Sequence, residues 1–473
     1  MTHPAIATDK GARTMTDAAH GSHGGASTGT DAGWAARVSR RNFLRSTAVG
    51  LGVAPALFAA PARAWAQGRA TLRVGLIGCG GRGTGAARDL ARGAEGIELV
   101  AMGDLVQDRI TRSQTELAEA IPESFKVDAG HVFSGFDAYL RVLETDIDLV
   151  ILATPPGFRP VHLAAAVESG KHVFTEKPVA VDPVGIRSVL ATAELAKQKS
   201  LALVAGTQRR HDPRYIEVMR RIHDGAIGEI TSGQVYWNQA GLWNFERTAG
   251  ISDTEWQIRN WLYFTWLSGD HIVEQHIHNI DVANWAFNGH PVRANGVGGR
   301  QSRVDPSYGH IFDHFAIELE YANGARILSM ARQQDGTARY VGERFAGTQG
   351  TASPSDRNPW IRSATDWRWE QEGEPINPYV QEHTDLVASI RNGSPLNEGN
   401  QVAESTLTAI LAREAAYTGQ DITWDEIMAS NLDLTPPSIA FGPMPFPPVA
   451  QPGLTKLERP AFGHSHEPMG GGI

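Results

Sequence analysis

The chain has 473 residues, 41% of them hydrophobic and 20% charged, which is typical of a soluble globular protein long enough for two domains. Its 43 Lys and Arg against 52 Asp and Glu give a net charge of −9, which excludes the basic surface of a nucleic-acid-binding protein. The single cysteine, Cys79, excludes an internal disulfide.

Residues 1–66 are predicted to be a leader and not part of a folded domain. Arg40-Arg41 precede an apolar run over 48–60, and the small-x-small triplet Ala64-Trp65-Ala66 follows it. This order resembles a twin-arginine export signal, and the glycines and proline inside the run favour a cleaved signal over a transmembrane anchor. We therefore expect a periplasmic or secreted protein that is exported folded, with its cofactor tightly bound and no stable membrane insertion.

A glycine-rich turn opens the predicted nucleotide-binding domain, residues 67–205. A short apolar strand over 72–77 runs into glycines spaced G-x-G-x-x-G, and a helix follows. In this motif the first glycine makes a tight turn, the second lets the backbone approach a pyrophosphate, and the third lets helix and strand pack closely. An incidental glycine-rich turn is the alternative. The cofactor candidates here are Gly78, Gly80, Gly81, Arg82 and Gly83.

An acid ends the next predicted strand, where a dinucleotide ribose would lie. The apolar run 98–102 is followed by Gly103-Asp104. A carboxylate in this place accepts hydrogen bonds from both ribose hydroxyls and repels a 2′-phosphate, so Asp104 favours NAD over NADP. The alternative is that Asp104 caps the helix predicted over 106–120.

Strands and helices continue to alternate up to residue 205. Apolar strands over 148–153, 171–174 and 201–205 alternate with helices over 161–168 and 183–197, which predicts a doubly wound parallel sheet. The carboxyl ends of such strands form the crevice in which cofactors lie. The cofactor candidates that follow these strands are Thr154, Pro155, Glu176, Lys177 and Gln208.

Two segments carry a family resemblance: 75–83, G-L-I-G-C-G-G-R-G, and 170–178, G-K-H-V-F-T-E-K-P. They resemble the glucose–fructose oxidoreductase and inositol dehydrogenase family, Gfo/Idh/MocA, and the resemblance covers roughly 72–427. It implies a Rossmann domain followed by an α+β domain over 206–433, whose open, mostly antiparallel sheet forms homodimers or homotetramers. It also implies that Lys177 lies beside the nicotinamide and polarises the reacting hydroxyl.

The second domain contains the stretch richest in reactive side chains, which we expect to form one helix over 268–287. On that helix, His271, Glu274, His278 and Asp281 share one face. The stretch resembles the family's D-x-x-x-H-x-x-D segment. The resemblance implies that His278 is the general base for a sugar hydroxyl, that Glu274 orients substrate and histidine, and that Asp281 is the second acid of the substrate site.

The histidines of this stretch leave two other interpretations open. His271, His276 and His278 lie close to acids and could bind a metal, but the HExxH spacing of a zinc helix is absent. They could also form a buried structural network. We predict no metal.

Substrate contacts are predicted from aromatic and basic residues of the same domain. Nine of the twelve tryptophans lie between Trp237 and Trp369. Their flat apolar faces suit the C–H faces of sugars, although most are expected in the core. We select Trp261 as a substrate candidate, and Arg209, next to Gln208, as another.

The C-terminal part combines helices and an irregular tail. Helices are predicted over 377–391 and 401–418, and the resemblance implies that they pack near the nucleotide domain. Residues 434–473 are rich in Pro and Gly and are expected to wrap a neighbouring subunit or to remain free.

Together these patterns predict an exported oxidoreductase. It would transfer hydride between a tightly bound NAD(H) and a hydroxyl or carbonyl of a sugar, polyol or sugar derivative. A redox-neutral, NAD-dependent glycoside hydrolase or lyase is the alternative, and a non-catalytic sugar sensor is a third hypothesis.

Overall fold

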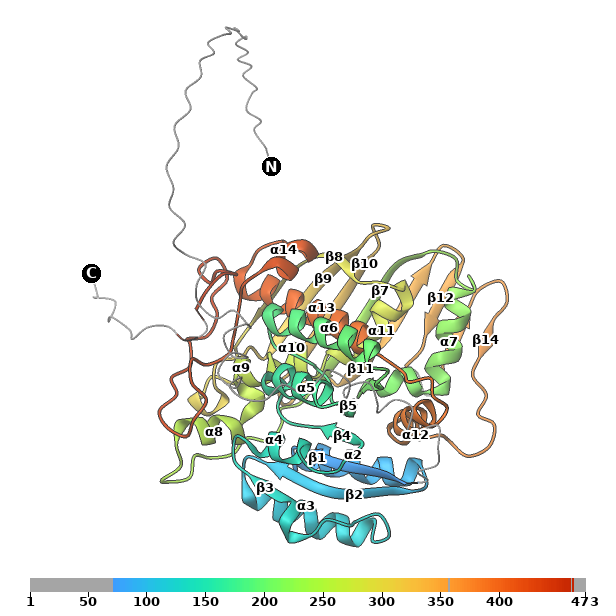
Figure 1. The fold of residues 1–473 in the computed structure, drawn as a ribbon. Helices are drawn as coiled ribbons and strands as arrows, with labels where there is room; N and C mark the ends of the chain where they lie inside the picture. Colours follow the sequence, from blue (N-terminus) through green and yellow to red (C-terminus); the bar gives the residue numbers. More distant parts are fainter. Residues whose placement is uncertain (1–70, 356–357, 461, 463–473) are drawn as a thin grey trace, which may run out of the picture. The chain divides into compact units, whose positions relative to one another are not determined.

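The structure is a computed structural model that describes residues 71–355, 358–460 and 462 (Figure 1). The predicted leader, 1–66, lies outside the described residues. Within the described ranges, no helix is both long enough and apolar enough to cross a membrane.

The first sheet has six strands, all parallel, in the order β3-β2-β1-β4-β5-β6. The strands are β1 (Leu72–Ile77), β2 (Ile97–Asp104), β3 (Val132–Ser134), β4 (Leu149–Leu152), β5 (His172–Thr175) and β6 (Leu203–Ala205). The helices between them are α2 (Gly81–Gly93), α3 (Gln107–Ala120), α4 (Ala138–Leu143), α5 (Arg159–Glu168) and α6 (Pro183–Gln198). Every residue of β4 and β5 is buried, because helices cover both faces of the sheet. The predicted doubly wound parallel sheet is confirmed.

The second sheet has nine strands in the order β14-β13-β12-β11-β7-β10-β9-β8-β15. They are β7 (Ile230–Gln239), β8 (Pro291–Gly299), β9 (His314–Tyr321), β10 (Arg326–Gln333), β11 (Tyr340–Gly347), β12 (Gly350–Ser353), β13 (Trp360–Arg362), β14 (Trp367–Arg368) and β15 (Ile422–Thr423). All neighbouring pairs are antiparallel except β7 and β10. This confirms the predicted mostly antiparallel sheet.

Helices connect the two sheets. Helix α13 (Gly399–Thr418) packs on β8 and β9 of the second sheet and also on α6 of the first half. Helix α12 (Pro378–Arg391) packs against α2, at the glycine-rich turn (Figure 1). A segment more than 200 residues later in the chain thus reaches the nucleotide half.

The single helix predicted over 268–287 is wrong, because the chain forms three short helices there: α9 (Thr265–Ser268), α10 (His271–Glu274) and α11 (Ile277–Phe287). Asp270 has a φ of +76°, which no helix accommodates, and its buried carboxylate accepts from Phe312 N at 2.8 Å. After α10 the register changes, because His276 N donates to the carbonyl five residues back at 3.2 Å. Buried polar contacts thus override the helical period.

The tail packs on its own chain as far as it is described. Leu432, Leu434 and Met444 are buried in a cluster with Trp256 and neighbouring aromatic side chains. Arg459 donates to the fully buried carboxylate of Glu414 at 2.6 Å. The tail therefore contributes to the fold through residue 460.

Candidate active site

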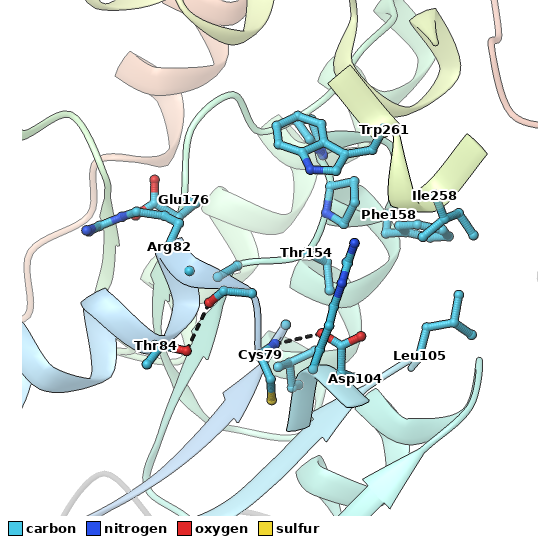
Figure 2. Close-up of a pocket in the computed structure, with 18 of the residues that line it drawn as sticks. Cys79, Arg82, Thr84, Asp104, Leu105, Thr154, Phe158, Glu176, Ile258 and Trp261 are labelled. Carbon is cyan, nitrogen blue, oxygen red and sulfur yellow. Dashed lines mark hydrogen bonds and ion pairs between the residues drawn. The ribbon is translucent and has the colours of Figure 1, made fainter. Parts of the chain in front are cut away.

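A cavity of about 620 Å³ lies at the carboxyl ends of the parallel strands (Figure 2). It extends from the glycine-rich turn to Lys177, Glu274 and His278, and so joins the predicted cofactor and catalytic residues. The sequence-predicted residues that line it are Gly78, Gly80, Gly81, Arg82, Asp104, Thr154, Pro155, Glu176, Lys177, Trp261, Glu274 and His278.

The glycines of the turn have different surroundings. Gly78 has a φ of +96°, and a Cβ on Gly83 would lie 1.9 Å from the carbonyl oxygen of Gly78. Gly80 and Gly81 have no heavy atom within 4 Å of where a Cβ would be. Helix α2 begins at Gly81 without a side-chain cap, so its first N–H groups are available to an anion. This open cradle at a helix N-terminus fits the pyrophosphate of a dinucleotide, whereas Gly83 supports the turn from behind.

Asp104 is 7% exposed and connects the end of β2 to the turn. Its carboxylate accepts from Cys79 N at 2.7 Å, as Figure 2 shows, and from Val106 N at 3.0 Å. The N-cap of α3 is Val106, so the alternative of Asp104 as that cap is wrong. A carboxylate held in this way has lone pairs left for ribose hydroxyls. Arg109, which the sequence did not single out, lines the same end of the cavity.

Lys177 and Glu274 form a nearly buried ion pair at the other end of the cavity. Their side chains are 11% and 14% exposed, and Lys177 Nζ lies 3.0 Å from Glu274 Oε1. Nζ also donates to the Glu274 main-chain oxygen at 2.6 Å. The break after α10 makes this possible, because His278 N bonds the carbonyl of Gln275 at 3.3 Å and not that of Glu274. Two of the three ammonium protons are thus used, and one remains for a ligand.

His278 lies beside this pair and is kept neutral by its surroundings. Its ring stacks on Trp237 with 5.6 Å between centroids. Burial, and then the cations of Lys177 and Arg209, hold the pKa of His278 well below its usual range. A neutral imidazole can accept a proton, which is the property required of a general base.

A charged network from distant parts of the chain holds Arg82 at the turn. Arg82 forms ion pairs with Glu176 and, at 3.3 Å, with Glu382 of α12. Its guanidinium carbon lies 5.1 Å from the ring centroid of Tyr379, which lines the cavity. Sequence reasoning missed Tyr379 and Glu382, because nothing in the local pattern of α12 indicates where that helix packs.

Four predicted site residues do not line the cavity. Gly83 lies behind the turn, and Gln208 is buried and donates to the Tyr379 hydroxyl at 3.0 Å. Arg209 pairs with the fully buried Glu343. Asp281 accepts from Arg210 at 2.9 Å and from Ser405 at 2.8 Å. The Arg209 guanidinium and the Asp281 carboxylate therefore have their ion-pair partners within the protein.

The other histidines of the stretch also point away from the cavity. His271 packs on Phe315, and His276 Nε2 lies 2.8 Å from Ser329 Oγ. In the part of the chain that the structure describes, no three His, Cys, Asp or Glu side chains are placed to hold a metal ion.

An aromatic segment after β7 forms a further wall of the cavity. Besides Trp261, it contributes Trp243, Phe245 and Ile258, none of which the sequence had singled out. Asn260 fixes this wall by accepting from Phe245 N at 2.8 Å and donating to its carbonyl at 2.6 Å. Figure 2 shows Trp261 and Ile258 facing the strand ends that carry Thr154 and Asp104.

Two family models match the chain. Residues 72–205 match the model described as an oxidoreductase family with an NAD-binding Rossmann fold, and residues 215–353 match the GFO/IDH/MocA C-terminal domain. The chain belongs to the Gfo/Idh/MocA family. The family predicted from the glycine turn and the Glu176-Lys177-Pro178 segment is thereby confirmed.

The curated relatives include proteins named as inositol dehydrogenases and as glycosyl hydrolases. The chain is 27% identical to an inositol 2-dehydrogenase of Saccharopolyspora erythraea over 361 residues, 74% of this chain and 94% of the relative. It is 26% identical to an NAD⁺-dependent scyllo-inositol 2-dehydrogenase of Bacillus subtilis, over 54% of this chain and 65% of the relative. A glycosyl hydrolase family 109 protein of Solibacter usitatus is 27% identical over 43% of this chain and 46% of that protein.

Solved structures show the same fold. A levoglucosan dehydrogenase in complex with NADH and levoglucosan superposes with a TM-score of 0.59 at 19% identity, covering 75% of this chain and 99% of the other. An scyllo-inositol dehydrogenase from Lactobacillus casei with NAD(H) and scyllo-inositol gives a TM-score of 0.56 at 21% identity, covering 75% of this chain and 99% of the other.

Proposed function

We propose that this chain transfers hydride between NAD(H) and a secondary hydroxyl or carbonyl of a sugar or polyol. One observation carries the proposal: a neutral His278 and a Lys177 ammonium with one unused proton lie in the same cavity as the glycine cradle. The relatives named as inositol and levoglucosan dehydrogenases support the substrate class. Bound NAD⁺ would supply the hydride acceptor.

The residues divide the proton chemistry between them. His278 accepts the hydroxyl proton at an imidazole nitrogen, which its low pKa leaves unprotonated at neutral pH. Lys177 Nζ donates its remaining hydrogen bond to the same oxygen and stabilises the negative charge that develops there. Glu274 holds the ammonium through two oxygens and so fixes its direction. The glycine cradle and Asp104 would hold the pyrophosphate and ribose.

Two variants and a matched control test this assignment. His278→Ala and Lys177→Met are expected to lower kcat by about 10²- to 10⁴-fold, the usual contribution of a positioned acid or base. Lys171→Met is the control, because Lys171 Nζ donates to the Ile147 carbonyl at 2.8 Å, and Lys171 does not line the cavity. The assay is nicotinamide absorbance with a panel of inositols, aldoses and glycosides. Full turnover by both site variants would refute the proposal.

We further propose that the cofactor is retained through turnover. Arg259 of α8 (Asp253–Arg259) reaches across to Asp108 of α3 with two N–O distances of 3.3 Å. This pair bridges the two halves beside the cavity, which Arg259 lines and Asp108 does not. On its other side α8 contacts the tail, since Thr254 Oγ1 donates to the Ala440 carbonyl at 2.8 Å and Gln257 to that of Met444. Both features support slow release of a dinucleotide.

The rate at which the protein releases NADH to a competing trap measures this retention. Arg259→Ala should accelerate release by up to about five-fold, because partly exposed ion pairs contribute about 1 kcal/mol or less. Adding Asp108→Ala to that variant should not accelerate NADH release any further. Arg247→Ala is the control. Arg247 forms an ion pair with Asp253, a residue of the same helix as Arg259, but this pair does not reach the nucleotide half. Release that is fast in the unaltered protein would contradict the proposal.

A redox-neutral glycosidase remains the second candidate, supported by the glycosyl hydrolase relative and by the Arg259–Asp108 pair that would slow release of the cofactor. In that case an aryl glycoside would release its aglycone with no lasting change in nicotinamide absorbance and no second redox substrate. In the dehydrogenase case, the sugar reduces the bound NAD⁺ once per active site, and the NADH signal stays until an added carbonyl compound takes the hydride back.

Export and assembly also stay proposals. Arg40-Arg41 and the apolar run over 48–60 support twin-arginine export to the periplasm or beyond, which substitution of both arginines by lysine should block, as seen by cell fractionation. The second sheet exposes Val297, Leu328 and Val341, which supports a homodimer or homotetramer. Light scattering would measure its mass.

A further inference from the structure

Arg159 is a buried cation in the wall of the cavity. It is the first residue of α5 and only 2% exposed. In the described part of the chain no carboxylate lies within ion-pair distance of its guanidinium. Burial lowers the pKa of Arg159 to about 10, against the opposing effect of Glu176 and Glu274, so the group is charged at neutral pH. A buried charge without a direct ion-pair partner is costly, and its retention calls for a specific use.

The two hydrogen bonds of Arg159 connect the two loops that carry the site. One terminal nitrogen donates to the carbonyl of Thr154, at the end of β4, and the other donates to the carbonyl of Pro178, after β5. Thr154 lines the cofactor side of the cavity, and Pro178 directly follows Lys177. One planar side chain therefore sets the distance between a cofactor-binding loop and the loop of the catalytic lysine.

Arginine is suited to this task for a geometric reason. Its guanidinium presents rigid donors in a fixed fork, whereas a lysine ammonium is a point charge on a flexible stem. Thr154 is held on its other side as well, because its hydroxyl lies 3.2 Å from Nδ1 of His162, which stacks on Tyr139 at 4.2 Å between centroids. The loop after β4 is thus fixed from two directions, and the Pro178 carbonyl is fixed against it.

We propose that Arg159 is a positioning residue, which acts through the Pro178 carbonyl to hold the Lys177 ammonium in register with the cofactor-binding loop. The inference rests on the proposed function, because it assumes that Lys177 acts on the substrate hydroxyl. A misplacement of about 1 Å in such a group can lower the rate by about 10²-fold.

The test is a double-mutant cycle with a matched control. Arg159→Met is expected to lower kcat by about ten- to a hundred-fold at saturating cofactor and sugar, and Arg159→Lys to restore part of it. In the Lys177→Met background, Arg159→Met should cost almost nothing further. Arg187→Met is the control: Arg187 also donates to two carbonyls, of Met428 and Ser430, at 2.7 and 2.8 Å, but away from the cavity.

The pH profile of kcat supplies a second readout. Lys177 is the leading cation that depresses the pKa of His278, and Arg159 is not one of the leading ones. A displaced Lys177 therefore moves the acid limb of Arg159→Met to higher pH, which a general loss of stability does not do.

The possible results separate the two proposals. Equal losses from Arg159→Met in the wild-type and Lys177→Met backgrounds would overturn the positioning role, and so would an unchanged kcat or an effect no larger than that of Arg187→Met. If Lys177→Met itself keeps full activity, the proposed function fails first. Should Arg159→Met not fold, Arg159→Lys in the same cycle decides the matter.

Discussion

Substituting single glycines of the turn should separate packing from ligand binding. Gly83→Ala places a methyl group between α2 and β1, whereas Gly80→Ala places one in the open cradle. The first variant is expected to lose stability and the second to lose NAD affinity while remaining folded. The two positions are three residues apart in one motif, so the contrast depends on tertiary contacts alone.

The magnitude for Gly83 follows from the distance to its neighbour. A Cβ would lie 1.9 Å from the carbonyl oxygen of Gly78, whereas ordinary contact begins near 3.4 Å, so the turn must move by about 1.5 Å. The clash is between backbone atoms, which no rotamer change relieves. Overpacking of this kind costs about 3 kcal/mol, which corresponds to a fall in Tm of about 6 °C.

For Gly80 no protein atom lies within 4 Å of the added methyl group, so stability should change by less than about 1 kcal/mol, the cost of a poorer N-cap. A pyrophosphate in the cradle would meet the methyl group directly, and NAD affinity should fall at least about ten-fold, or about 1.4 kcal/mol. Thermal unfolding and calorimetric titration with NAD measure the two effects. Unchanged affinity in Gly80→Ala would refute the placement of the pyrophosphate, and an unchanged Tm in Gly83→Ala would refute the packing argument.

Three further predictions concern charge. Burial and Lys177 depress the pKa of His278, so the acid limb of the kcat/KM profile should lie well below the pH of about 6.5 that is usual for a histidine. Lys177→Met should move the acid limb to higher pH, and a variant profile identical to that of the wild type would contradict this. Burial lowers the pKa of His276 to about 3, so protonation favours the unfolded chain. The contribution of His276 to stability is therefore complete above about pH 6.5 and falls by about 1.4 kcal/mol per pH unit below it. Other buried histidines add to the total slope, so His276→Gln should lower that slope by about this amount in urea titrations. Arg459→Ala leaves the fully buried Glu414 with one cation fewer and should cost up to about 3 kcal/mol; calorimetric unfolding at the wild-type Tm would show instead that the tail contributes nothing.

Much of the cofactor half could be predicted because its signals are local. Glycines at 78, 80 and 83, and the apolar strands between helices, follow from backbone and burial requirements that act within a few residues. The same holds for Asp104, Glu176 and Lys177, since strand ends of a parallel sheet meet at one edge. The prediction of one helix over 268–287 was wrong because its determinants are not local. Its register depends on the buried contacts of Asp270 and on a Lys177 that is distant in the sequence.

The sequence by itself determined the fold class, the family and the edge of the sheet at which the chemistry lies, because periodicity and short motifs encode them. Tertiary structure decided which polar groups are spent inside the protein and which remain for ligands. Arg209 and Asp281 resemble site residues in the sequence but are paired with Glu343 and Arg210. Arg159 donates one hydrogen bond to a carbonyl of each loop. No sequence motif marks it, since its role arises where two strand ends converge.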